Sequence, residues 1–257
     1  MALYSKSFVH PNSSEWVVFV HGAGGSSSIW FQQLKAFKKG FNVLLLDLRG
    51  HGHSQTNPDE ENYSFDLIIQ DIIDLLDEKK IKSAHFVGIS LGSMISKLLA
   101  IYHPERVKSL ILGGNIVKLN LKSRILLFLG NRLKHIVPFM WLYKLFATII
   151  LPHKNHIESR KLFIKEAARM DQKEFLKWFR LTKELPKILS VIRNIKSQTP
   201  TLCIQGQQDY MFLKEFVQSI KSTKEHLHVI ASCGHVVNVE KPYLFNELSI
   251  NFLNENT

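Results

Sequence analysis

The stretch HFVGISLGSM, residues His85–Met94, places one serine, Ser90, between Gly88 and Gly92. Apolar and β-branched residues precede this serine and helix-forming residues follow it, which predicts a strand, a sharp turn and a helix. A serine on such a turn has a strained backbone, and glycine two positions before and after it avoids collision with neighbouring chain. We therefore expect the Ser90 hydroxyl to project above the carboxyl edge of a sheet, beside the helix N-terminal amide of Leu91.

Short apolar segments recur along the chain and predict the other strands of that sheet. Their continuous hydrophobicity is typical of strands that are buried on both faces. Helical patterns lie between several of them, and the clearest begins at Ser64, a predicted N-cap, with one apolar face that includes Asp71. This alternation predicts an α/β fold with a doubly wound, mostly parallel sheet. The predicted strands are Trp16–Val20, Asn42–Asp47, Ala84–Gly88, Ser109–Gly114, Thr201–Gly206 and Leu227–Ser232, with an edge strand at Leu3–Phe8.

The alternation of strands and helices stops after Gly114. Helical patterns then follow one another to residue 198, separated at Pro138, Pro152 and Pro186. A helical insertion between two strands of one sheet lies over the strand ends, which makes it a candidate lid. We predict an α/β core formed by residues 1–114 and 199–257, and an all-helical lid insertion at residues 115–198.

The positive charge of the chain is concentrated in this insertion. The net charge is +11, and residues 115–198 hold 18 Lys and Arg against 5 Asp and Glu, whereas the rest holds 15 against 17. These cations form either a solvated helix face or a landing surface for an anionic partner, such as an acyl-carrier protein, a coenzyme A moiety or an acidic lipid surface. No nucleic-acid-binding motif accompanies them, so nucleic acid is not an expected partner.

The most apolar region, Ile125–Leu151, is interrupted by charged residues, including Arg132 and Lys144. Its uncharged pieces are much shorter than the roughly 18 apolar residues of a transmembrane helix. The first residues show no secretory signal pattern. We expect a cytoplasmic protein without a transmembrane segment.

A serine becomes a useful nucleophile only when a base removes its proton and a carboxylate orients that base. Asp209 follows one predicted strand, in CIQGQQDYM, and His235 follows the next, in VIASCGHVV. Because the carboxyl ends of parallel strands meet at one edge of a sheet, we expect both residues near Ser90. The chain order Ser, Asp, His differs from the orders of the trypsin-like and subtilisin-like enzymes.

Oxyanion donors are expected from the glycine-rich segment HGAGGSSS, His21–Ser28, which follows the first central strand. Its glycines permit close backbone approach, so the amide of Ala23 can face that of Leu91 across the site. The segment lacks the G-x-x-x-x-G-K-[ST] pattern of a phosphate-binding loop. His21 is expected to brace the loop rather than to transfer protons.

Neither the histidine pairs nor the cysteines predict a metal site. His51 and His53 form an H-x-H pair, which by itself supplies too few ligands for a metal ion. His153 and His156 are expected to be solvated residues of the lid. The two cysteines, Cys203 and Cys233, lack C-x-x-C spacing and are expected to be buried thiols.

Taken together, HGAGG, DLRGHGHS, GISLGS, GQQD, and CGH followed by VEKP resemble the motifs of α/β-hydrolases, in particular the compact lid-bearing serine hydrolases that include carboxylesterases and carbon-carbon bond hydrolases. The resemblance implies Ser90 as nucleophile, His235 as base and then acid, Asp209 as its orienting partner, and the amides of Ala23 and Leu91 as oxyanion hole. It also implies that DLRGHGHS is a structural turn beside the site. Related dehalogenases and epoxide hydrolases carry aspartate at the elbow, and Ser90 argues against both. Some relatives place the acid where this chain has Asn115, which is no carboxylate, so Asp209 is favoured.

The aromatic and aliphatic residues of the insertion predict an apolar pocket over the site. We predict a serine hydrolase that cleaves esters of hydrophobic acyl groups through an acyl-enzyme on Ser90 and needs no cofactor or metal. A thioesterase or a carbon-carbon bond hydrolase uses the same three residues. From another class, some proteins resembling α/β-hydrolases keep these residues but act as ligand sensors. The sequence leaves these alternatives open.

Overall fold

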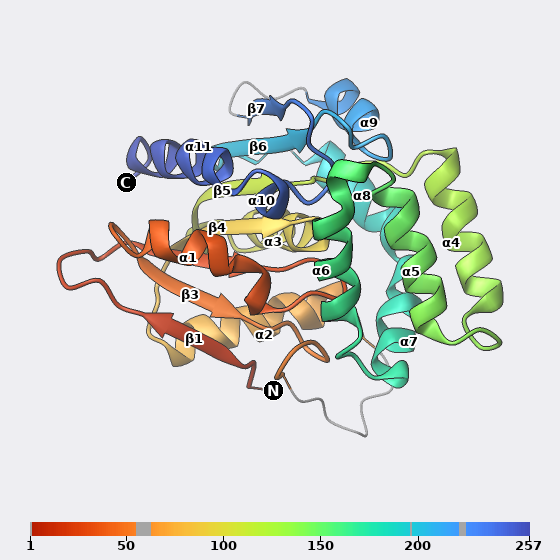
Figure 1. Cartoon of the computed structure of the whole chain (residues 1–257). Coiled ribbons are helices and arrows are strands. Elements are labelled where there is room, and N and C mark those ends of the chain that lie inside the picture. Colours follow the sequence, from red (N-terminus) through yellow and green to blue (C-terminus); the bar gives the residue numbers. More distant parts are fainter. Residues whose placement is uncertain (1, 55–62, 196, 221–224) are drawn as a thin grey trace.

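The structure is a computed structural model that describes residues 2–54, 63–195, 197–220 and 225–257. Within these residues a sheet of seven strands forms the centre of the protein, in the order β1-β3-β2-β4-β5-β6-β7. Strand β1 pairs antiparallel with β3 at one edge, and the other neighbours pair in parallel (Figure 1). The strands are β1 (Ser5–Phe8), β2 (Trp16–Val20), β3 (Asn42–Leu46), β4 (Ala84–Ile89), β5 (Val107–Gly113), β6 (Thr201–Gly206) and β7 (Glu225–Ile230).

Helices cover both faces of the sheet, which confirms the predicted doubly wound architecture. Alternate side chains of β2 show the two layers: Val18 and Val20 join the apolar cluster beneath α2 and α3, whereas Val17 and Phe19 join the cluster beneath α1 and α11. These helices are α1 (Phe31–Phe37), α2 (Phe65–Glu78), α3 (Leu91–Tyr102) and α11 (Pro242–Asn254), and two short helices, α9 (Leu213–Ser219) and α10 (Val237–Glu240), follow β6 and β7.

Among the described residues between β5 and β6, the chain forms five α-helices. They lie beyond the carboxyl ends of the parallel strands, with α6 nearest the sheet and α4 outermost in the view of Figure 1. The three prolines expected to separate them lie at or next to helix boundaries: Pro138 caps α5, Pro152 follows it, and Pro186 stands in the first turn of α8. The helices are α4 (Leu121–Leu133), α5 (Phe139–Ile150), α6 (Ile157–Ala167), α7 (Gln172–Arg180) and α8 (Leu185–Asn194).

The predicted burial of the last strand was wrong. Strand β7 begins and ends two residues before the predicted Leu227–Ser232 segment, and several of its side chains are partly exposed, with Val229 40% accessible. The reason is its position, because β7 is an edge strand that pairs with β6 alone. Apolar composition therefore does not distinguish an edge strand from a central one.

A carboxylate in the apolar face of α2 is explained by a buried ion pair. The Ser64 side chain caps this helix by accepting from the amide of Leu67 at 3.1 Å. Asp71, in the middle of α2, is buried and accepts two hydrogen bonds from Arg49, Nε to Oδ2 at 2.6 Å and Nη2 to Oδ1 at 2.7 Å. This bidentate pair fixes the turn that follows β3 against α2.

Replacing Asp71 with alanine should lower the free energy of unfolding by about 3–5 kcal/mol, because it leaves the buried Arg49 guanidinium without its carboxylate. Equilibrium urea unfolding measures this loss. Asp74→Ala is the matched control, since Asp74 lies on the exposed face of the same helix, and should change stability by less than about 0.5 kcal/mol. Equal stability of the two variants would contradict the assignment of this pair.

Candidate active site

Ser90 lies on the tight turn between β4 and α3. Its backbone has φ 55° and ψ −116°, a left-handed conformation that a non-glycine residue adopts only at a cost. The Ser90 amide donates to the carbonyl of Gly113 on β5 at 2.9 Å, which holds the turn against the sheet. The strained turn exposes the side chain at the carboxyl edge, as the sequence predicts.

The flanking glycines are required by close backbone packing. A Cβ at Gly88 would lie 2.5 Å from the carbonyl oxygen of Gly92, and a Cβ at Gly92 would lie 2.0 Å from the carbonyl oxygen of Val20. Both distances are far shorter than a carbon–oxygen contact allows. The first turn of α3 can therefore press against the ends of β4 and β2 only because neither position has a side chain.

His235 bridges the serine and a carboxylate. Its Nε2 lies 2.9 Å from the Ser90 Oγ, and its Nδ1 lies 2.8 Å from Asp209 Oδ2. A carboxylate only accepts, so Nδ1 carries the hydrogen and Nε2 is left to accept from the serine hydroxyl. Asp209 is fully buried and also accepts from the amide of Phe212 at 3.2 Å. The structure thus brings together the three side chains singled out in the sequence.

The two predicted oxyanion residues lie on either side of Ser90. Ala23 and Leu91 line the same cavity as Ser90 and His235. Leu91 is the first residue of α3, so its amide has no acceptor within the helix and lies at the positive end of the helix dipole. The loop that carries Ala23 packs on the elbow, since a Cβ at Gly22 would be 3.3 Å from the Ser90 Cβ.

Two buried histidines brace this loop, as expected for His21. The His21 Nε2 accepts from the amide of Leu48 at 2.9 Å, and its Nδ1 contacts the carbonyl of Gly22 at 2.8 Å. The His51 Nε2 accepts from the amide of Gly24, also at 2.9 Å. Burial, together with the neighbouring His21 ring, lowers the pKa of His51 to about 3, and burial also lowers the pKa of His21. Both rings are therefore neutral acceptors at neutral pH.

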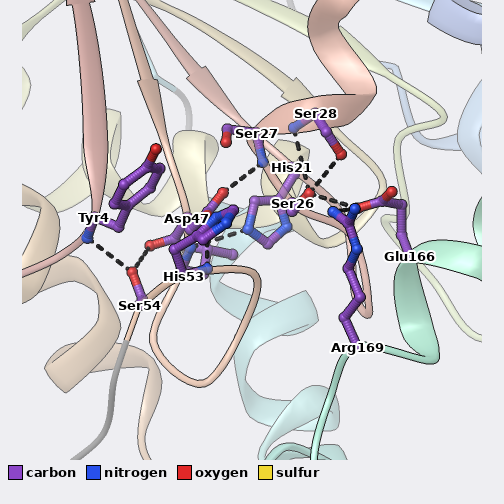
Figure 2. A network of polar contacts seen from close by, with 11 residues as sticks. Tyr4, His21, Ser26, Ser27, Ser28, Asp47, His53, Ser54, Glu166 and Arg169 are labelled. Carbon is purple, nitrogen blue, oxygen red and sulfur yellow. Dashed lines mark hydrogen bonds and ion pairs between the residues drawn. The ribbon is translucent and has the colours of Figure 1, made fainter.

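A carboxylate after β3 holds the other end of the loop. Figure 2 shows Asp47 accepting from the amide of Ser27 at 2.6 Å and from that of His53 at 2.8 Å. Burial alone would raise the pKa of Asp47, but these amide donors hold it below its ordinary value. The turn is closed by Ser54, which donates to the Asp47 carbonyl and accepts from the Tyr4 amide. This is the structural turn predicted for DLRGHGHS.

Side chains of the helical segment make polar contacts with these loops that the sequence analysis did not predict. Glu166 on α6 is buried and accepts from the Ser26 Oγ at 2.5 Å, and Arg169 approaches the same carboxylate (Figure 2). The Tyr143 hydroxyl on α5 donates to the carbonyl of Ala23 at 2.7 Å, and Trp178 Nε1 on α7 donates to the carbonyl of Arg49 at 3.0 Å. Trp178 was expected only as one of the insertion's aromatic residues over the site, and no signal in the sequence distinguishes Glu166 from the other acidic residues of the insertion.

An apolar cavity of about 280 Å³ extends from Ser90 beneath the helical segment. Many of its walls come from α4, α5 and α7, and its described lining residues include no Asp, Glu, Lys or Arg. A second, much smaller recess of about 30 Å³ lies beside Ser90; Glu166 and Ser159 border it, but its surface is almost entirely apolar. The two spaces share Ala23, Ser90 and His235, so the site has a large apolar side and a small, mostly apolar side.

The remaining histidines and cysteines lie as follows. His156, which we expected to be solvated, is fully buried, because its Nε2 contacts the side chain of Gln208 at 2.9 Å where the helical segment meets the loop after β6. His53 packs against the Tyr4 ring, whereas the His51 Nε2 accepts from the Gly24 amide. Both cysteines are buried thiols, as predicted, and burial raises the pKa of Cys203 to about 12.

A mostly parallel sheet with a serine on the turn after its central strand, and a histidine and aspartate on neighbouring loops, has the arrangement of an α/β-hydrolase. A model of the family described as alpha/beta hydrolase fold matches residues 15–156, and the chain belongs to this family. This agrees with the resemblance found in the sequence.

Comparison with individual proteins gives hydrolases of several kinds. The chain is similar to epoxide hydrolase 4 of Homo sapiens, with 26% identity over 94% of this chain and 73% of that one. It is 32% identical to 3-oxoadipate enol-lactonase 1 of Acinetobacter baylyi over 42% of this chain and 40% of that one. A hydrolase from Pseudomonas aeruginosa PA01 has the same fold, with a TM-score of 0.81 and 22% identity over 98% of this chain and 94% of that one.

The buried histidines make stability depend on pH. The unfolded chain takes up a proton on His51 near pH 6.5, whereas the folded chain resists it down to about pH 3. The free energy of unfolding should therefore fall as the pH is lowered from about 6.5, by up to about 1.4 kcal/mol per pH unit for this one proton. Urea unfolding between pH 7.5 and the acid limit of reversibility measures the slope.

His51→Gln keeps an acceptor for the Gly24 amide but cannot be protonated, so its stability should depend less steeply on pH than that of the wild type. His53→Gln is the matched control, since the His53 side chain is 65% exposed, and should keep the wild-type dependence. If His51→Gln and the wild type lose stability in parallel, the buried imidazole is not the group responsible.

Proposed function

We propose that this protein is a serine hydrolase that cleaves carboxylic esters with hydrophobic acyl groups through an acyl-enzyme on Ser90. The observation that carries the proposal is the Ser90–His235–Asp209 relay, with contacts of 2.9 and 2.8 Å, at one end of the uncharged cavity. In this proposal residues 1–114 and 199–257 form the catalytic core. Residues 115–198 form the lid that encloses the acyl chain.

The reaction follows from these contacts. The Ser90 Oγ attacks the ester carbonyl while His235 Nε2 takes the hydroxyl proton, and the amides of Ala23 and Leu91 stabilise the oxyanion. His235 then returns the proton to the departing alkoxide, which leaves the acyl group on Ser90. A water molecule gives a proton to His235 and attacks the acyl carbonyl. The acid leaves, and Ser90 regains its hydrogen. Asp209 stabilises the imidazolium in both half-reactions.

The two spaces beside Ser90 suggest where the acyl group and the leaving group of an ester would lie. The large cavity is walled by aliphatic and aromatic side chains, which favours a neutral acyl chain over a substrate with a carboxylate at that end. The recess on the other side of Ser90 has a volume of only about 30 Å³ and a mostly apolar lining, with the Glu166 carboxylate behind it, which disfavours a large or anionic leaving group. The site therefore favours esters of an apolar acid and a small neutral alcohol. Serine at the elbow argues against the aspartate-based chemistry that the resemblance associates with epoxide hydrolases.

Ser90→Ala should remove labelling by a fluorophosphonate and lower kcat for p-nitrophenyl esters by about 10⁴-fold or more, because no other group supplies the nucleophile. Ser83→Ala, at the opposite end of β4, is the matched control and should keep both. Wild-type protein should turn over many times and prefer longer acyl chains to acetyl. A folded wild type that resists labelling would contradict the proposal, and a single slow turnover would favour a ligand sensor.

Glu166→Ala should lower kcat by about 10- to 100-fold with little change in KM for a p-nitrophenyl ester, because it frees the loop that positions the Ala23 amide without altering the acyl cavity. Glu158→Ala, on the exposed face of the same helix, should behave as the wild type. Glu166→Gln keeps an acceptor for Ser26 and should restore most of the activity. A rise in KM alone would show that Glu166 acts on the substrate rather than on the loop.

A further inference from the structure

The outer faces of α4 and α5 expose large apolar side chains at positions where a helix in contact with water normally carries polar ones. On α4, Leu121, Ile125 and Phe128 follow one another at three- and four-residue intervals, and Phe128 is 58% exposed. On α5, Trp141 is 71% exposed and is followed by other exposed apolar side chains at four-residue intervals. We define the α4–α5 surface as Leu121, Ile125, Phe128, Leu129, Leu133, Ile136, Trp141, Leu145 and Ile149, together with the exposed cations Lys122, Arg124, Arg132 and Lys144.

The charge of this surface has one sign. No Asp or Glu occurs in the sequence between Glu105 and Glu158, so the four cations lie among apolar side chains without an acidic residue on either helix. Arg132 lies over the Phe128 ring, 5.3 Å from its centroid, so that a guanidinium and an aromatic side chain share the face. Basic residues bordering Trp, Phe, Leu and Ile on one helix face are the composition of helices that lie in a membrane interface.

The active-site cavity lies directly beneath this surface. Leu129, Leu133 and Leu145 line the cavity and are also 48%, 37% and 53% exposed, respectively. Side chains of α4 and α5 therefore belong both to the cavity wall and to the exposed face. In Figure 1 these two helices lie at the end of the molecule that is furthest from β1.

We propose that the α4–α5 surface docks peripherally on an anionic lipid bilayer, so that apolar substrate passes from the lipid into the active-site cavity beneath this surface. Within the described residues every helix is too short or too polar to span a bilayer, which fits helices that lie in its surface. Docking does not depend on the proposed esterase activity, whereas the delivery of substrate rests on it.

A second copy of the chain is a poorer occupant of this face. A two-fold dimer through the α4–α5 surface would bring each patch against its own copy. Four cations would then oppose four cations, and neither helix supplies an acidic residue to pair with them. An anionic lipid surface instead provides headgroups for the cations and an acyl boundary for Trp141 and Phe128.

The test is sedimentation of the full-length protein with vesicles of phosphatidylcholine alone and of equimolar phosphatidylcholine and phosphatidylglycerol. Binding to the anionic vesicles should be at least about tenfold tighter than to the neutral ones and should weaken as NaCl is added. Phe128→Ser/Trp141→Ser and Lys122→Glu/Lys144→Glu should each weaken binding by about tenfold or more. None of these four residues lines the cavity, so turnover of soluble p-nitrophenyl acetate should be unchanged in both variants.

Matched controls replace the same residue types elsewhere on the surface. Val9→Ser/Tyr243→Ser removes two apolar side chains that are 74% and 89% exposed, and Lys35→Glu/Lys39→Glu reverses two exposed charges, one on α1 and one just after it. Both controls should bind as the wild type does, and so should Ser90→Ala, which separates docking from catalysis. Lipids brominated on the acyl chain should quench part of the tryptophan fluorescence of the wild type and should leave that of Trp141→Phe nearly unchanged.

Three results would overturn the proposal: no binding to anionic vesicles, binding that the four α4–α5 substitutions leave unchanged, or a wild-type dimer that the Phe128→Ser/Trp141→Ser variant dissociates. A hydrolase that is active on soluble esters but fails to bind vesicles would refute docking alone. A protein that binds vesicles but resists the fluorophosphonate would refute the proposed function alone.

Discussion

The close approach of α3 to the end of β2 is the contact on which the rest of the site depends. Because the backbone of Gly92 packs against the carbonyl of Val20, the turn between β4 and α3 has no room to relax, and Ser90 is held at a positive φ. That single conformation aims the hydroxyl away from the sheet and sets the Leu91 amide beside it. The loops after β6 and β7 then need only follow their strands to bring Asp209 and His235 within hydrogen-bond reach.

The opposite wall of the site is rigid for a different reason. The loop carrying Ala23 has no regular secondary structure across its glycines, so its shape comes from side chains that accept or donate hydrogen bonds around it. Two of these are imidazoles kept neutral by burial, which lets each accept from a backbone amide, and another is the carboxylate of Asp47. Contacts from α5 and α6 add the Tyr143 hydroxyl and Glu166, so the helical segment constrains the very loop that it covers.

The sequence predicts the place of a site residue when that residue directly follows a strand, and not when its place depends on how separate segments pack together. Ser90, Asp209 and His235 each come directly after an apolar segment, and parallel strands bring their carboxyl ends together, so the neighbourhood of the three could be predicted without knowing any contact. Glu166, Tyr143 and Trp178 could not, because their positions depend on how the insertion packs on the core. His156 was misplaced for the same reason, and the partial exposure of β7 depends on strand order.

The helices α4 and α5 show a further limit of hydrophobic patterning, since an apolar residue at helical spacing indicates a face that avoids water but not what covers it. On these helices apolar side chains occur on two sides, one towards the cavity and one towards the outside. Packing around the cavity accounts for the inner apolar side chains. It does not account for the outer ones, because exposing apolar surface to water is energetically unfavourable. In the docking proposed above, the cations account for the outer face. A face buried in the protein excludes unpaired charge, whereas a face that meets lipid headgroups is stabilised by cations, so the absence of acidic residues from α4 and α5 favours the lipid-facing role proposed for their outer sides.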